Sequence, residues 1–81
     1  MSDYLEAQNV FGARKGDTIF VFCSARTGEN GWMNSWVPAM DNSIGKYGKV
    51  AYLYGCQGIM IDFLGSCNRY CFPYFCCNII R

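Results

Sequence analysis

Five short runs of β-branched and aromatic residues constrain this chain more than any other feature of its sequence. In chain order they are GDTIFVFCS (16–24), YGKVAYLY (47–54), GIMIDF (58–63), RYCF (69–72) and CNIIR (77–81). The link between the second and third runs is short enough for a hairpin, and Pro73 ends the fourth because proline donates no hydrogen bond to a sheet. With one long first loop (24–46), this pattern predicts an all-β fold: a small, sharply bent, five-stranded barrel.

The first run predicts a strand that is covered on both sides. Alternation divides its side chains between two faces, with Ile19, Val21 and Cys23 on one and Thr18, Phe20 and Phe22 on the other. Both faces are largely apolar, so we expect other parts of the chain to cover each of them.

The residues before the first run, 1–14, form a separate N-terminal segment in our prediction, and 15–81 form the barrel. Three apolar residues of this segment have helical spacing: Tyr4, Ala7 and Phe11. Asn9 and Val10 interrupt the pattern. The segment is therefore either a short helix or an extended arm.

Composition and charge exclude several classes of protein. The chain has 81 residues, enough for one domain, and its net charge of +1 comes from basic residues that are scattered along it. Nucleic-acid binding normally requires a concentrated basic face. The N-terminus lacks the pattern of a signal peptide, and no apolar run approaches the roughly 20 residues of a membrane span. We therefore expect a cytoplasmic protein with reduced cysteines and no membrane partner.

The stretch GENGWMNSWVPAMDNSIGKYGKV (28–50) carries a resemblance to a known family. A strand start at Gly16-Asp17, followed by GW, IGKYGKV and a closing FP, resembles the SH3-like repeat of Mind bomb and KEG-type ubiquitin ligases. The block NGWMNSWVPAMD is more similar still to small stand-alone bacterial and phage proteins. The resemblance covers 15–80 and implies an SH3-like barrel. It does not imply ubiquitin transfer, and SH3-like barrels serve many unrelated functions.

Six cysteines raise the question of a metal site or disulfides; they are Cys23, Cys56, Cys67, Cys71, Cys76 and Cys77. Their spacing lacks the C-x2-C pairs of structural zinc sites, and the chain has no histidine. Cys71, Cys76 and Cys77 stand where the similar family has tryptophan or aliphatic residues, so the resemblance implies core positions. We expect buried thiols without metal, with Cys56 and Cys67 the more exposed. A zinc site or a disulfide framework is the alternative.

The sequence does not predict catalysis. The absence of histidine removes the commonest general base at neutral pH, and the six acidic residues are spread singly. GENG (28–31) and GKYGK (45–49) contain glycine and lysine, but no helix follows to receive a phosphate, so we interpret them as turns. We expect a non-enzymatic protein without a cofactor.

The two tryptophans, Trp32 and Trp36, lie in the long loop. In one interpretation both rings are internal and hold the loop down. In the other, one ring seals the end of the barrel and the other stands in an aromatic cleft that receives an extended peptide, as in SH3 domains. The residues assigned to this partner-binding cleft are Arg26, Glu29, Trp32, Met33, Trp36, Tyr47 and Tyr74.

These observations together predict a non-enzymatic module that binds a protein or peptide. The resemblance to phage chains implies a host protein as the partner, which the module would modulate or inhibit. The alternative is a nucleic-acid-binding barrel within a larger complex, with bases stacked on Phe20, Tyr52, Tyr54 and Tyr70. A third hypothesis is a homo-oligomer that buries its excess aromatic residues between copies.

Overall fold

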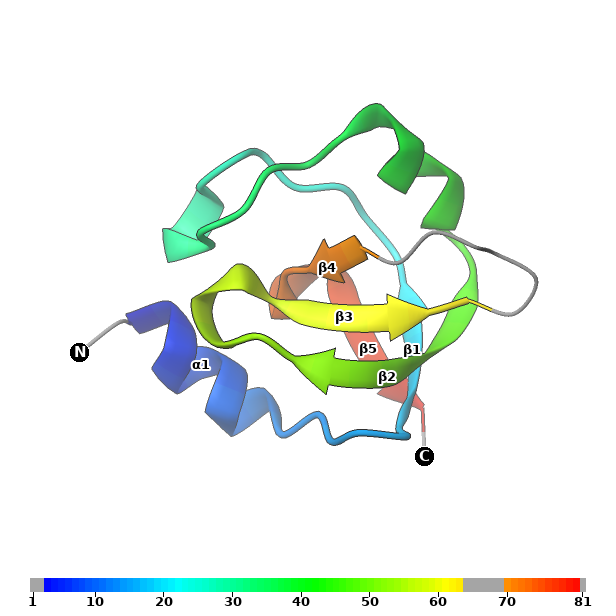
Figure 1. Ribbon diagram of the computed structural model, residues 1–81, viewed down its shortest axis with the longest axis horizontal. Coiled ribbons are helices and arrows are strands. Elements are labelled where there is room, and N and C mark those ends of the chain that lie inside the picture. The colour runs from blue at the N-terminus through cyan, green and yellow to red at the C-terminus, as the bar shows by residue number, and fades with distance from the viewer. Residues whose placement is uncertain (1–2, 64–69, 81) are drawn as a thin grey trace.

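The computed structural model describes residues 3–63 and 70–80 and contains a five-stranded antiparallel sheet beside one short helix (Figure 1). The strands are β1 (Thr18–Val21), β2 (Tyr47–Leu53), β3 (Ile59–Asp62), β4 (Tyr70–Phe72) and β5 (Cys77–Ile80). Short 3-10 helices lie between them: η1 (Glu29–Gly31), η2 (Pro38–Ser43), η3 (Gly55–Gln57) and η4 (Tyr74–Cys76). Each strand lies within one of the five predicted runs, which confirms their positions.

The strand order is β4-β3-β2-β1-β5. The chain meanders from β1 to β4 and then returns to place β5 on the other side of β1. The described strands therefore form an open sheet with β4 and β5 at its edges, where the sequence predicted a barrel. β4 has only three residues, and Pro73 after it has no N–H to donate. The backbone N–H of Cys76 then bonds the carbonyl of Pro73 (3.1 Å), so this segment turns instead of lengthening a ladder.

The N-terminal segment is a helix, α1 (Asp3–Phe11), and not an extended arm. It lies beside η1 and η3 (Figure 1). The ring of Tyr4 is buried and packs on Tyr74, with 5.2 Å between ring centroids. The helix ends at Gly12, where φ is +78° and the N–H bonds the carbonyl of Gln8 (3.2 Å). The domain is thus mostly strands with one short helix, which was one of the two alternatives that the sequence left open for this segment.

The core lies between the inner face of the sheet, α1 and the long loop. The sheet contributes Ile19, Val21, Val50, Ile59, Ile61 and Phe72, all buried. The long loop contributes Trp32 and Met40, and α1 contributes Tyr4. Because these parts share one apolar cluster, the long loop is a layer of the domain and not a connection outside it.

The two faces of β1 differ in burial, although the sequence predicted cover on both. Ile19 and Val21 have no exposed surface, whereas Phe22 just beyond the strand is exposed. On the outer side, Phe20 packs on Tyr47 of the neighbouring strand, with 4.8 Å between ring centroids. An aromatic cross-strand pair therefore shields this face locally, in place of a second layer of chain.

A bulge in β2 changes the direction of its side chains. Val50 pairs with Ile61, but Tyr52 pairs with Met60, so the strand holds one residue more than its partner at this point. In a regular strand Tyr52 would lie on the same face as the buried Val50. The extra residue turns Tyr52 outward, and the second half of β2 presents its aromatic side chains to solvent.

Candidate binding surface

Trp32 lies in the core and not in an open cleft. Its side chain has no exposed surface, and its indole N–H donates to the carbonyl of Gln57 in η3 (2.7 Å). Its backbone N–H donates to the carbonyl of Glu29, which closes the turn of η1 (3.0 Å). The structure therefore assigns Trp32 the sealing role that we had left open for either tryptophan, and its ring is not available as a direct partner contact.

Trp36 lies closer to the surface. Its indole N–H donates to Oδ1 of Asp41 in η2 (2.7 Å), and its ring meets Phe72 edge-on, with 5.7 Å between centroids. The chain is extended at Trp32 and again at Val37, so the two indoles do not share a helical face. Trp36 is half-buried, so of the two tryptophans it is the one with exposed surface.

Tyr47 and Tyr74, the other two aromatic residues of the predicted cleft, have separate surroundings. Tyr47 packs on Phe20 at the start of β2. Tyr74 packs on Tyr4 and Phe11 of α1, with 5.2 and 6.0 Å between centroids. The aromatic contacts of the described residues thus divide the predicted cleft among the sheet, the helix and the long loop.

The remaining predicted residues lie together in the long loop. The backbone N–H of Arg26 donates to Oε1 of Glu29, and the N–H of Glu29 donates back to the carbonyl of Arg26, both at 3.0 Å. The Glu29 carboxylate therefore stabilises a turn. Gly28 lies in this turn with φ +76°, a conformation that glycine adopts readily. The side chain of Arg26 is exposed.

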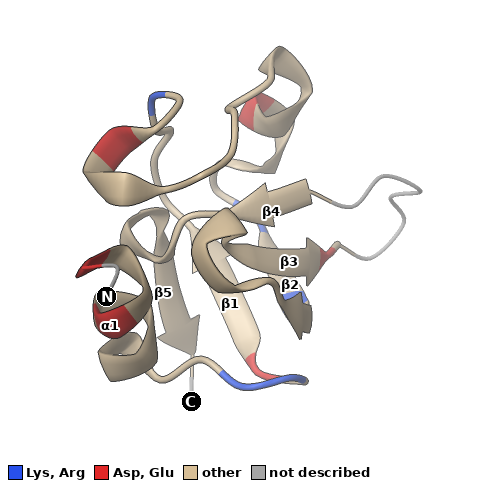
Figure 2. Ribbon diagram, turned by 60° about the vertical axis from the view of Figure 1, so that its left-hand side comes forward, with Lys and Arg blue, Asp and Glu red and all other residues tan. Residues whose placement is uncertain are grey.

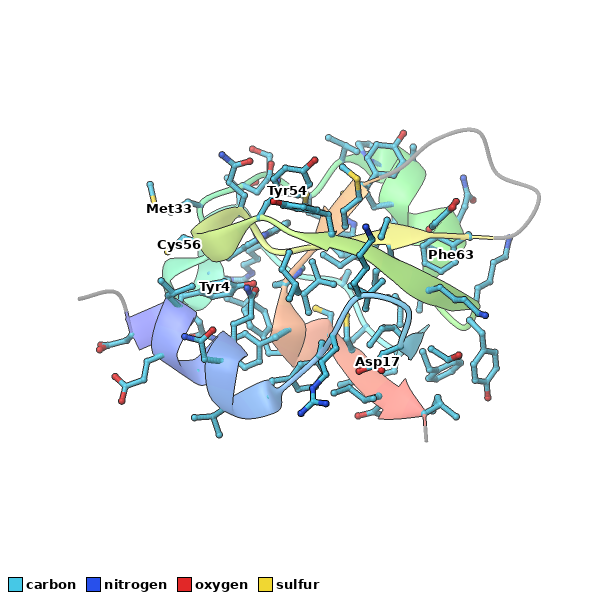
Figure 3. The ribbon with its side chains drawn as sticks, turned by 60° about the horizontal axis from the view of Figure 1, so that its bottom comes forward. Tyr4, Asp17, Met33, Tyr54, Cys56 and Phe63 are labelled. Atoms are coloured by element: carbon cyan, nitrogen blue, oxygen red, sulfur yellow. The ribbon has the colours of Figure 1, made fainter. Side chains whose placement is uncertain are left out.

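Met33 follows this turn and is exposed although its backbone is held. Its N–H donates to the carbonyl of Cys56 (2.8 Å), and the side-chain amide of Asn34 donates to the carbonyl of Gln57 (3.3 Å). Figure 3 shows Met33 next to Cys56 and pointing away from the ribbon. The side chain is 72% exposed, so a partner can reach it while its backbone stays in place.

An open pocket of about 510 Å3 adjoins this methionine. Its lining residues are Thr27, Gly28, Gly31, Trp32, Met33, Asn34 and Ser35. Trp32 lies buried beneath the pocket, so the surface that a partner can reach comes from the other lining residues. We refer to this surface as the Met33 pocket.

A second exposed feature lies on the outer side of the sheet, where the bulge turns Tyr52 outward. The rings of Tyr52 and Tyr54 lie 4.8 Å apart between centroids, and their side chains are 54% and 44% exposed. Met60 and Cys71 continue the row across β3 and β4 in register. We call these four residues the outer face. The predicted peptide cleft did not include these residues, although the nucleic-acid alternative named Tyr52 and Tyr54; the bulge that exposes Tyr52 has no signal in the alternation of β2.

Charge does not concentrate on either surface. Figure 2 shows the Lys and Arg residues of the described chain at separate places on the ribbon. On the sheet, Lys49 pairs in register with Asp62, which places opposite charges side by side. Of the aromatic residues suggested for base stacking, Tyr52 and Tyr54 lie together, whereas Phe20 contacts Tyr47.

Cys76 and Cys77 are buried, and Cys23, Cys56 and Cys71 are partly buried, so each described cysteine is at least partly packed as expected. Burial raises the pKa of the Cys77 thiol to about 12, and this thiol donates to the carbonyl of Pro73 (3.5 Å). Cys67 lies outside the described residues. Within 3–63 and 70–80, no group of three or more cysteine or acidic side chains is arranged to hold a metal ion.

Comparisons with protein-family models, with curated proteins and with solved structures found no match to this chain. The resemblance carried by NGWMNSWVPAMD is therefore an expectation from the sequence alone. Among the helices in the described part of the chain, none has the length and apolar character needed to cross a membrane.

Proposed function

We propose that this protein is a non-enzymatic recognition module whose Met33 pocket binds an extended segment of another protein. The observation that carries the proposal is Met33, an exposed apolar side chain held by its backbone at the edge of a pocket with Trp32 buried beneath it. Methionine is common on binding surfaces because its unbranched, polarisable side chain adapts to different apolar partners.

The second part of the proposal concerns the fold class, an SH3-like barrel. What supports it is the strand order, in which the last strand returns to pair with the first after a four-stranded meander. Such a return is how a small antiparallel sheet curls toward closure. The family resemblance of 15–80 points to the same class.

The partner segment that fits this surface is extended and carries an apolar side chain. Apart from Trp32 and Met33, the lining residues between Thr27 and Ser35 are small or polar, which leaves room for one side chain of the partner beside Met33. The exposed side chain of Arg26 adds a cation beside the turn, where it favours an acidic residue in the partner. Fixed backbone on the receiving side reduces the entropy lost on binding.

A display library of short linear peptides of random sequence tests the proposal. We expect selection on the wild-type protein to enrich peptides that share an apolar residue, and Met33→Asp to weaken their binding by about tenfold or more. Val10→Asp is the matched control, because Val10 is also an exposed apolar residue (83%) but lies on α1.

Equal binding of the enriched peptides to wild type and Met33→Asp would contradict the proposal. Failure of the library to yield any peptide with an apolar consensus would contradict it as well. Circular dichroism and urea unfolding of the three proteins establish that lost binding does not come from lost folding.

The outer face supports a second candidate function, binding of single-stranded nucleic acid. Two exposed tyrosine rings 4.8 Å apart can each stack on a base. We expect a fluorescent oligo-dT strand to bind at low salt, and the double variant Tyr52→Ala, Tyr54→Ala to lose that binding. Absence of binding by the wild type at low salt, with dT and with an RNA strand, removes this candidate.

A further inference from the structure

Three cysteines lie near one another where β1 and β5 pair. The register matches Val21 with Cys77, and beyond it the N–H of Phe22 donates to the carbonyl of Cys76 (3.0 Å). Cys23 thus follows the last paired residue of one strand, and Cys76 precedes the first residue of the other. Continued by one residue, the register places 22 opposite 76, so Cys23 and Cys76 lie one position apart at the end of this strand pair.

The side chains of Cys23 and Cys76 point toward the same place. The thiol of Cys23 lies 3.9 Å from the carbonyl oxygen of Phe75, the residue bonded to Cys76. The electrostatic surroundings of the Cys76 thiol include the Cys23 side chain, which places the two side chains near each other. Two cysteines on hydrogen-bonded neighbouring segments meet one requirement for a disulfide, a short separation between their backbones.

The two thiols differ in their access to solvent. Cys23 is partly buried, so a small oxidant in solution can reach its sulfur, whereas Cys76 has no exposed surface. Burial raises the pKa of the Cys76 thiol, which keeps this sulfur protonated and slow to react with a peroxide directly. This asymmetry defines an attacking cysteine and a resolving cysteine.

We propose that Cys23 and Cys76 form an intramolecular disulfide when the folded protein meets a hydroperoxide. The Cys23 sulfur takes one oxygen of the peroxide, the O–O bond breaks, and the peroxide leaves as an alcohol, or as water when it is hydrogen peroxide. The Cys76 sulfur then attacks the resulting sulfenic acid. The S–S bond forms, the S–O bond breaks, and the Cys76 proton leaves with the oxygen as water. In total the two thiols lose two electrons and the peroxide gains them.

The disulfide would join the first residues of the long loop to the turn before β5. The long loop carries the Met33 pocket, so oxidation would attach the first residues of this loop to the edge of the sheet. This inference does not depend on peptide binding, because it concerns only the two thiols and the strand ends that hold them.

The experiment treats the folded protein with hydrogen peroxide, alkylates the remaining thiols and measures the intact mass and the unreduced peptide map. We expect two fewer alkylated cysteines than in the untreated protein and a cross-linked peptide pair containing Cys23 and Cys76. The triple variant Cys56→Ser, Cys67→Ser, Cys71→Ser is the matched background, since it removes the other candidate partners except the buried Cys77.

We make Cys23→Ser and Cys76→Ala separately in that background. In each variant we expect peroxide treatment to leave the number of alkylated cysteines unchanged. Cys23→Ser changes a partly exposed position, so it tests the proposal even where a change at buried Cys76 disturbs folding. Oxidation of Cys23 to sulfinic acid with Cys76 still alkylatable in denaturant would overturn the proposal. So would a cross-link from Cys23 to Cys77 in place of Cys76.

Discussion

Adding a single methyl group at Gly58 should strongly lower the free energy of unfolding. Gly58 follows η3 with φ +112° and ψ −162°, a conformation that is essentially restricted to glycine. A Cβ built there would lie 2.6 Å from the carbonyl oxygen of Phe72 and 2.9 Å from the indole nitrogen of Trp32. The first neighbour is backbone and the second is held by its hydrogen bond to Gln57, so neither can move freely.

We expect Gly58→Ala to lower the free energy of unfolding by about 4 kcal/mol. Backbone strain in this region contributes about 2 kcal/mol, and forcing a methyl group into a packed site contributes about 2 kcal/mol more. A chain of this length has a total stability of roughly 4–12 kcal/mol, so the variant should lose about a third of that stability or more.

Gly45→Ala is the matched control, because Gly45 also has a positive φ (+85°) but nothing lies within 4 Å of an added Cβ. It carries the strain of the left-handed region alone, about 1–2 kcal/mol. The entropy that alanine removes from the unfolded chain is the same in both variants and cancels in the comparison.

Urea unfolding followed by tryptophan fluorescence measures the difference, since Trp32 is buried and becomes exposed on unfolding. With an m-value of about 1 kcal/mol/M, the midpoint of Gly58→Ala should fall about 2 M below that of Gly45→Ala. Equal midpoints for the two variants would refute the reasoning, because they would mean that the space around Gly58 can accept a methyl group without cost.

Three further predictions concern other buried or bonded groups. Tyr4→Phe should lower the free energy of unfolding by about 1–3 kcal/mol, which thermal unfolding measures. The buried Tyr4 hydroxyl donates to Oε1 of Gln8 (2.7 Å), and removing it leaves this acceptor without that donor. Trp36→Phe should lower the free energy of unfolding, measured in urea, by about 1 kcal/mol, because it removes the indole donor to Asp41. In the Trp36→Phe background, Asp41→Asn should lower it little further. For Cys77 the raised folded pKa of about 12 means that the unfolded chain loses this proton first, so stability is fully present below about pH 9 and falls as pH rises toward 12. Cys77→Ala should make that fall shallower by about 1.4 kcal/mol per pH unit between pH 9 and 11, and an unchanged slope would exclude Cys77 as its source.

The sequence predicted the positions of the strands well because each lies in a run of β-branched or aromatic residues bounded by a turn. It left the choice between a helix and an arm open at the N-terminus, because Asn9 and Val10 interrupt the apolar face; the structure shows both exposed on a helix. Local pattern alone does not place Tyr4 in the core, because its neighbour Tyr74 comes 70 residues later.

The candidate site was harder to predict than the fold. Which tryptophan is buried depends on a hydrogen bond from Trp32 to Gln57, 25 residues away, and the sequence pattern around either indole does not reveal it. Exposure of Tyr52 depends on the bulge in β2, which is set by pairing with β3. The exposure of Met33 depends less on distant residues, since it lies in a turn-rich segment, and its role in binding stays a prediction.

Trp32 has a consequence for how the domain moves. A loop that only covered a sheet could swing open while the strands stayed folded. Here, lifting the loop away would pull an indole out of the interior and leave a hole that water cannot fill favourably, so opening and global unfolding should cost nearly the same. The amides of Trp32 and Met33 should consequently exchange with solvent as slowly as those of the central strands, and the methionine is displayed on a scaffold that is already rigid before any partner arrives.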